Sequence, residues 1–138
     1  MSEIISSDVL ADAQLHRLTD LRLGLLRLHK ALLDMERINY EKVFGRVNSG
    51  ELLQIVLNHP QFGWLRLISA LIVEIDEILN DDEPVTVSDF EQLISGAQTL
   101  LTSSENEEFK TKYQAALQRE PDIVMAHSNV IKLLRQNH

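Results

Sequence analysis

The chain has 138 residues, of which 44% are hydrophobic and 25% are charged, and these ordinary globular values predict a single folded domain over residues 1–138. It contains no cysteine, which excludes disulfide bonds, thiol catalysis and cysteine-ligated zinc. The 13 basic and 21 acidic residues give a net charge of −8, which repels phosphate backbones and predicts no nucleic-acid partner.

No targeting or membrane-spanning segment is recognisable in the sequence. Residues 1–8 lack a cationic start followed by an apolar stretch, and the longest strongly apolar run, residues 67–73, is too short to span a bilayer. We therefore expect a cytoplasmic protein with no membrane partner, in which residues 1–7 form a flexible tail.

The first expected element is a long amphipathic helix from about Asp8 to Phe44. Its apolar residues recur at alternating steps of three and four: Leu18, Leu21, Leu25, Leu28, Leu32 and Met35. Gly45 is suited to end this helix. Gly24 lies inside it, where glycine costs about 1 kcal/mol relative to alanine, so we expect a close helix neighbour there, with a ligand notch as the alternative.

A short connecting helix should follow, because Asn48 and Glu51 have the spacing of a capping box. His59 and Pro60 end it. Apolar residues from Phe62 to Leu79 then predict a second long helix, which we expect to be the most buried element of the fold.

Two further long helices complete the prediction. Ser88 with Glu91 resembles a capping box that opens the third, and Ser104 with Glu107 repeats the signal within it. Pro121 suits the first turn of the last helix. The predicted fold class is all-α: a bundle of four long helices, with a short connecting helix after the first and a proline break before the last segment.

Charge is unevenly distributed along the chain. Four bases gather in residues 17–30, whereas residues 74–83 carry six acids and no base. Since helices joined by short turns pack antiparallel, we interpret this asymmetry as complementarity between the two helices; a docking surface for a partner is the alternative.

The motifs that identify common enzymes are missing. The sequence has neither the Glu-x-x-His pairs of di-iron bundles nor two histidines four residues apart, and it has no phosphate-binding loop, dinucleotide fingerprint or nucleophile elbow. These absences favour a protein that is not an enzyme, and we assign no catalytic residue.

A ligand site could still assemble from distant residues. His29, Glu36 and Tyr40 are spaced to project in similar directions from the first helix, and Glu74 and Asp76 fall near the apolar face of the second long helix. His127 would add a ligand from the last helix. We expect no cofactor; if the chain does bind a metal ion or haem, these six residues are the candidate ligands.

The same stripe of polar residues also has a structural interpretation. Glu36, Tyr40 and a network of Arg37, Glu41 and Arg66 would form one or two ion pairs at a helix interface, so that removal of Arg37 strands a buried Glu36. Phe62 and Trp64 are interpreted as an aromatic anchor of the core at a helix start.

The segments Leu28–Arg37 with Tyr40-Glu41, Phe62–Arg66 and Leu71–Glu77 resemble a small family of uncharacterised bacterial all-helical proteins. The resemblance extends over residues 28–80. It implies a bacterial cytoplasmic protein and a helical fold, and it brings no activity, substrate or partner with it.

Two functions of different classes remain open. The first is a non-enzymatic helical protein that binds another protein or itself, for example as a homodimer, because catalytic spacings are absent and apolar surface on the Trp64 helix is in excess of what one chain covers. The alternative is a bundle that binds a metal ion or haem through inward-facing histidine and glutamate residues.

Overall fold

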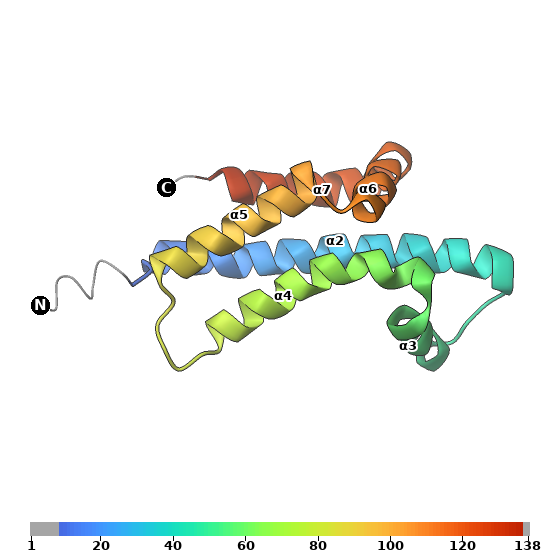
Figure 1. Ribbon diagram of the computed structural model, residues 1–138, viewed down its shortest axis with the longest axis horizontal. Helices are drawn as coiled ribbons and strands as arrows, with labels where there is room; N and C mark the ends of the chain where they lie inside the picture. Colours follow the sequence, from blue (N-terminus) through green and yellow to red (C-terminus); the bar gives the residue numbers. More distant parts are fainter. Residues whose placement is uncertain (1–8, 137–138) are drawn as a thin grey trace, which may run out of the picture.

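A computed structural model describes residues 9–136, which form six α-helices and one 3₁₀ helix. The longest, α2 (Asp12–Phe44), runs through the middle of the molecule (Figure 1). Helix α4 (Arg66–Leu79) packs antiparallel to it on one side and α7 (Pro121–Arg135) antiparallel to it on the other. The all-α class is confirmed.

The remaining elements connect these three helices. Helix α3 (Ser49–Asn58) and the 3₁₀ helix η1 (Pro60–Leu65) join α2 to α4. Helices α5 (Val87–Ser103) and α6 (Glu107–Arg119) join α4 to α7. The short connecting helix after α2 and the break at Pro121 are both present, as predicted.

The expected set of four long helices is not found in residues 9–136. Helix α2 has 33 residues, whereas the others have 10 to 17. The segment expected to form the third long helix is divided between α5 and α6, because Asn106 accepts the backbone N–H of Phe109 at 3.0 Å and so caps a new helix. Ser104, predicted as that cap, accepts the N–H of Asn106 instead.

The start of α5 also differs from the prediction. Thr86, and not Ser88, is the N-cap, and Asp89 completes the capping box. The backbone just before α5 is held extended, because Thr86 forms an isolated antiparallel bridge with Val9. In the same contact, the N–H of Leu10 donates to the carbonyl of Val85 at 2.8 Å. The same bridge delays the start of α2 to Asp12. The tail predicted for residues 1–7 lies outside the described residues.

One hydrophobic core extends along α2. Its five seam leucines are fully buried: Leu18, Leu21, Leu25, Leu28 and Leu32. The segment 62–79, expected to be the most buried element, contributes six buried residues, Phe62, Trp64, Leu65, Ile68, Ile72 and Ile75, and exposes Val73 and Glu74 on the outer side of α4. Helix α2 is flanked on two sides and is therefore the central element.

The predicted charge complementarity between α2 and α4 is present at one ion pair, Arg22 with Asp76. Lys30 pairs along α2 with Asp34 instead. No helix in residues 9–136 combines the length and the apolar composition that crossing a membrane requires.

Candidate interaction surface

Glu36 is a buried acid at the end of the leucine seam of α2, with 6% of its surface exposed. The indole N–H of Trp64 donates to Oε2 at 2.8 Å, and the amides of Asn39 and Gln61 donate to Oε1 at 3.2 and 3.4 Å. None of the ion pairs among the described residues includes Glu36. The expected pairing with Arg37 is therefore wrong, and neutral donors satisfy the carboxylate instead.

The 3₁₀ helix η1 holds two of these donors in place. His59 precedes Pro60, and its Nδ1 accepts the backbone N–H of Gln61 at 3.1 Å. Gln61 Nε2 also donates to the backbone carbonyl of Glu36 at 3.1 Å. Trp64 is buried against Phe109 of α6, with ring centroids 5.6 Å apart, so it anchors the core as the sequence indicated.

Arg37 and Glu41 hold the loop between α2 and α3. The carbonyl of Val47 accepts from Arg37 Nη2 at 2.8 Å, and its N–H donates to Glu41 Oε2 at 2.9 Å. The two side chains also pair with each other at 3.6 Å. Arg66 donates to the carbonyl of Leu57 in the last turn of α3. These three residues fix α3 at the end of α2 and do not line a ligand site.

An aromatic cluster leads from the core to the surface at this end of the molecule. The ring of Tyr40 lies 4.6 Å from that of Phe44, 5.3 Å from His59 and 6.1 Å from Phe62, measured between centroids. Phe62 is buried and Phe44 is exposed. Tyr40, a ligand candidate, therefore packs among rings.

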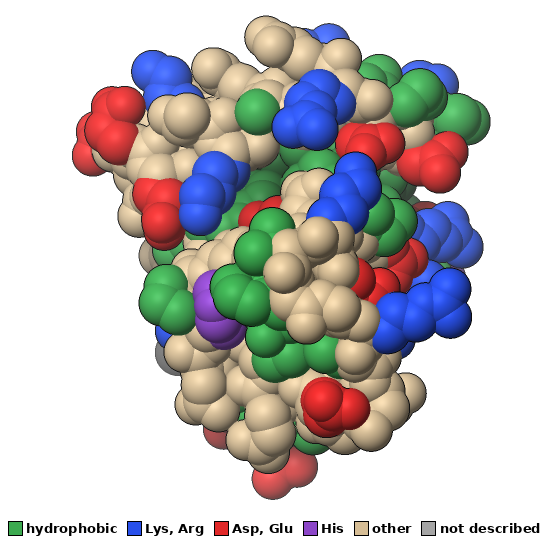
Figure 2. Space-filling view, turned by 90° about the vertical axis from the view of Figure 1, so that its right-hand side faces the viewer, with side chains coloured by type: hydrophobic (Ala, Val, Ile, Leu, Met, Phe, Trp, Pro, Cys, Tyr) green, Lys and Arg blue, Asp and Glu red, His purple; other side chains and the backbone are tan. Residues whose placement is uncertain are grey.

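Exposed apolar side chains gather around this cluster. We define the end surface as Val43 and Phe44 of α2 and Leu53 and Leu57 of α3, which are 55–73% exposed. Figure 2 shows hydrophobic side chains reaching the surface across this end face, with basic and acidic side chains interspersed around them. Helix α3 buries none of its ten residues, although five are aliphatic. Its apolar face is thus covered only in part.

A groove of about 370 Å³ lies beside the end surface, between the last turns of α2 and helix α6. Val43 belongs to both. The lining residues, which we call the α2–α6 groove, are Met35, Glu36, Asn39, Val43, Gln61, Trp64, Lys112, Ala115, Ala116 and Arg119.

The other candidate ligands are not brought together. Glu74 is exposed, since it lies on the outer face of α4, and Asp76 is engaged by Arg22. No group of three or more His, Asp or Glu side chains within residues 9–136 is arranged to hold a metal ion.

The two candidate histidines have separate surroundings. His29 is half-buried on α2, and burial lowers its pKa. On α7, His127 Nδ1 lies 2.6 Å from the hydroxyl of Tyr113, and its pKa is lowered by burial and by the charge of Arg135. Burial raises the pKa of Tyr113, so its hydroxyl stays protonated beside the ring nitrogen of His127.

Arg17 is a structural residue that the sequence did not reveal. It is 8% exposed, and its Nε and Nη2 donate to the carbonyls of Leu133 and Leu134 at 2.9 and 3.1 Å, at the C-terminal end of α7. Its guanidinium also lies over the ring of Phe90. Since its partners are more than 100 residues away along the chain, no local pattern indicates this role.

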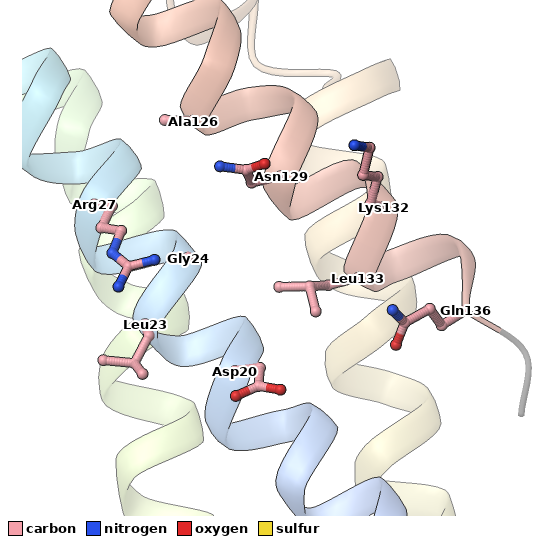
Figure 3. A pocket seen from close by; sticks show the side chains of 9 residues that line it. All are labelled: Asp20, Leu23, Gly24, Arg27, Ala126, Asn129, Lys132, Leu133 and Gln136. Carbon is pink, nitrogen blue, oxygen red and sulfur yellow. The ribbon is translucent and has the colours of Figure 1, made fainter.

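A second groove, of about 540 Å³, follows the contact between α2 and α7 (Figure 3). Gly24 lies against α7 there: a Cβ at this position would meet Val130 Cγ2 at 3.1 Å. Close helix packing therefore explains the glycine. Leu23, Arg27 and Lys132 are among the residues that line this groove (Figure 3).

Searches of protein-family models, of curated proteins and of solved structures find no match to this chain.

Proposed function

We propose that this chain is a non-enzymatic helical protein that binds another protein through the end surface. The observation that carries the proposal is the exposure of four apolar side chains at the end of the molecule where α2 stops and α3 follows (Figure 1), together with the fact that α3 buries none of its residues. Exposed apolar side chains gathered in one region of a surface are typical of interaction sites.

The energetics of the end surface are consistent with such a role. Each of its four side chains would contribute about 1 kcal/mol or more if a partner covered the exposed part, before the entropic costs of association. The site is also preorganised, because Arg37, Glu41 and Arg66 fix α3 against α2.

A two-hybrid selection with the whole chain as bait tests the proposal. Partners isolated with the wild-type chain are expected to be lost with Leu57→Asp and kept with Leu23→Asp, a matched change at an exposed leucine outside the end surface. The chain itself is included as prey, so that self-association is scored with the same variants. Partners that all tolerate Leu57→Asp, or a selection that yields none, would overturn the proposal.

The metal or haem alternative has no observation in its favour. Asp76, Tyr40 and His127 are engaged in an ion pair, an aromatic cluster and a hydrogen bond, respectively. Glu36 already accepts three hydrogen bonds. We therefore retain protein binding as the proposed function.

A further inference from the structure

The apolar seam of α2 continues beyond the part of the helix that its neighbours cover. Leu32, Asn39 and Val43 follow one another at steps of seven and four, so they share one face of the helix. Leu32 is fully buried, whereas Val43 is 73% exposed. The α2–α6 groove lies at this transition. A further helix laid along this face would extend the packing that the seam begins.

The groove is suited to a large apolar side chain. Met35, Val43, Ala115 and Ala116 supply apolar walls. The carboxylate of Glu36 at its base needs no further partner, because it already accepts from Trp64 and the amides. An apolar anchor would therefore not strand this buried acid.

Two bases, Lys112 and Arg119, line the groove, in a protein whose net charge is −8. Lys42 and Arg46 flank Val43 and Phe44 in the sequence and are exposed. Lys112 pairs with Glu108 at 3.4 Å, whereas Arg119, Lys42 and Arg46 form no ion pair with any described residue. The only acid that lines the groove is Glu36, whose carboxylate is buried. A binding partner with acidic side chains is therefore complementary to this rim.

We infer that the α2–α6 groove binds an acidic amphipathic helix of a partner protein, with one apolar anchor between Val43 and Ala116 and acidic side chains toward Arg119 and Lys42. The inference rests on the proposed function and specifies the chemistry of the partner. In a helix-in-groove complex of this kind, apolar anchors spaced by three or four residues enter the groove. The acidic residues lie on the other face of the same helix and flank these anchors.

A display library of 16-residue helical peptides, randomised on both faces and selected against the whole chain, tests this inference. The selected peptides are expected to carry a net negative charge and leucine or phenylalanine at i, i+3 or i+4 spacing. Trp64 is the only tryptophan of the chain and lines the groove, so a change in its fluorescence is the readout of binding for peptides that contain no tryptophan. Arg119→Glu and Val43→Asp should each weaken binding by about tenfold or more, and Leu23→Asp should not.

Exchanging the charges of the peptide and of the groove gives a more stringent form of the same experiment. A peptide in which the acids are replaced by lysine is expected to bind Arg119→Glu better than it binds the wild-type chain. Neutral or basic peptides among the selected binders, or acidic binders that tolerate both groove variants, would overturn the inference. A Trp64 response to phosphatidylglycerol vesicles without any response to acidic peptides would overturn it in favour of a lipid surface.

The outcomes separate the inference from the proposed function. Selected peptides whose binding requires Leu57 but which show no excess of acidic residues would support the proposed function and contradict the inference. If no selected peptide depends on Leu57, Val43 or Arg119, or if none is selected, both fall.

Discussion

Glu36 lies where the leucine seam of α2 meets the 3₁₀ helix η1, and its surroundings show why a sequence pattern misassigns such a residue. An arginine one position away suggested an ion pair, but Arg37 points to the α2–α3 loop and Glu36 to Trp64. The carboxylate is stable in the core because three side-chain N–H groups replace the water that it loses.

Replacing Glu36 with leucine should lower the free energy of unfolding by about 2 kcal/mol, because the buried indole N–H of Trp64 loses its acceptor. Glu36→Gln keeps an acceptor oxygen and should cost less, about 1 kcal/mol. Urea unfolding followed by circular dichroism measures both. A Glu36→Leu variant as stable as the wild-type chain would show that the hydrogen bonds contribute nothing net.

Two histidines should make stability fall in mildly acidic solution. The pKa values of His29 and His127 are lowered from 6.5, so below about pH 6.5 the unfolded chain binds more protons than the folded one. The stability that the two neutral histidines contribute is present above about pH 6.5 and is lost as the pH falls below it. The urea midpoint should therefore decrease from pH 7.5 to 5.5, and it should decrease less in a His29→Gln/His127→Gln variant. An identical decrease in both proteins would contradict the assignment.

At the level of elements, Arg17 links the first turns of α2 to the last turn of α7. Helix C-termini have carbonyls without partners in the helix, and the guanidinium of Arg17 satisfies two of them. This contact closes the end of the molecule at which α2 begins and α7 ends (Figure 1).

Arg17→Met should destabilise the fold by about 2 kcal/mol, because two charge-assisted hydrogen bonds are lost from a buried position. Amide hydrogen exchange in the last turn of α7 should become faster. Arg27→Met, at an exposed position of the same helix, is the control and should stay within about 0.5 kcal/mol. Equal effects of the two substitutions would contradict the capping role.

Arg37→Ala should cost about 1 kcal/mol, well below the several kcal/mol expected if it stranded a buried Glu36. Its partner is Glu41, and both side chains keep about a quarter to a third of their surface exposed. The substitution mainly removes the hydrogen bond that Arg37 donates to the carbonyl of Val47 in the α2–α3 loop, so the melting temperature should fall only modestly. A loss near 3 kcal/mol would restore the interpretation drawn from the sequence.

The sequence predicted those features that depend on neighbouring residues. The seam of α2, the Asn48–Glu51 capping box and the Pro121 break all follow from local spacing, and all are present. The starts of α2 and α5 were misplaced because a bridge between Val9 and Thr86, 77 positions apart, sets both. The site was misjudged for the same reason: Glu36 and Trp64 meet only through the packing of η1 on α2.

At the level of the whole molecule, the hydrophobic core of the described residues is well covered along most of α2. It is covered incompletely at the end where α2 stops and α3 follows. There Leu53 and Leu57 of α3 and Val43 and Phe44 of α2 face outward, and Lys112 and Arg119 line the groove beside them. A solitary folded protein gains nothing from four exposed large hydrophobic side chains in one place.

The most direct measurement is a paired determination of stability and of partner affinity for the Leu53→Asp/Leu57→Asp variant, using a partner isolated in the two-hybrid selection. Because both leucines are more than half exposed, the free energy of unfolding should change by no more than about 0.5 kcal/mol. The affinity for the partner should fall by about 100-fold or more, since two charges would be buried without counter-charges. An unchanged affinity would contradict the assignment of the end surface as a binding site, and so would a stability loss above about 2 kcal/mol, which would identify the leucines as part of the core.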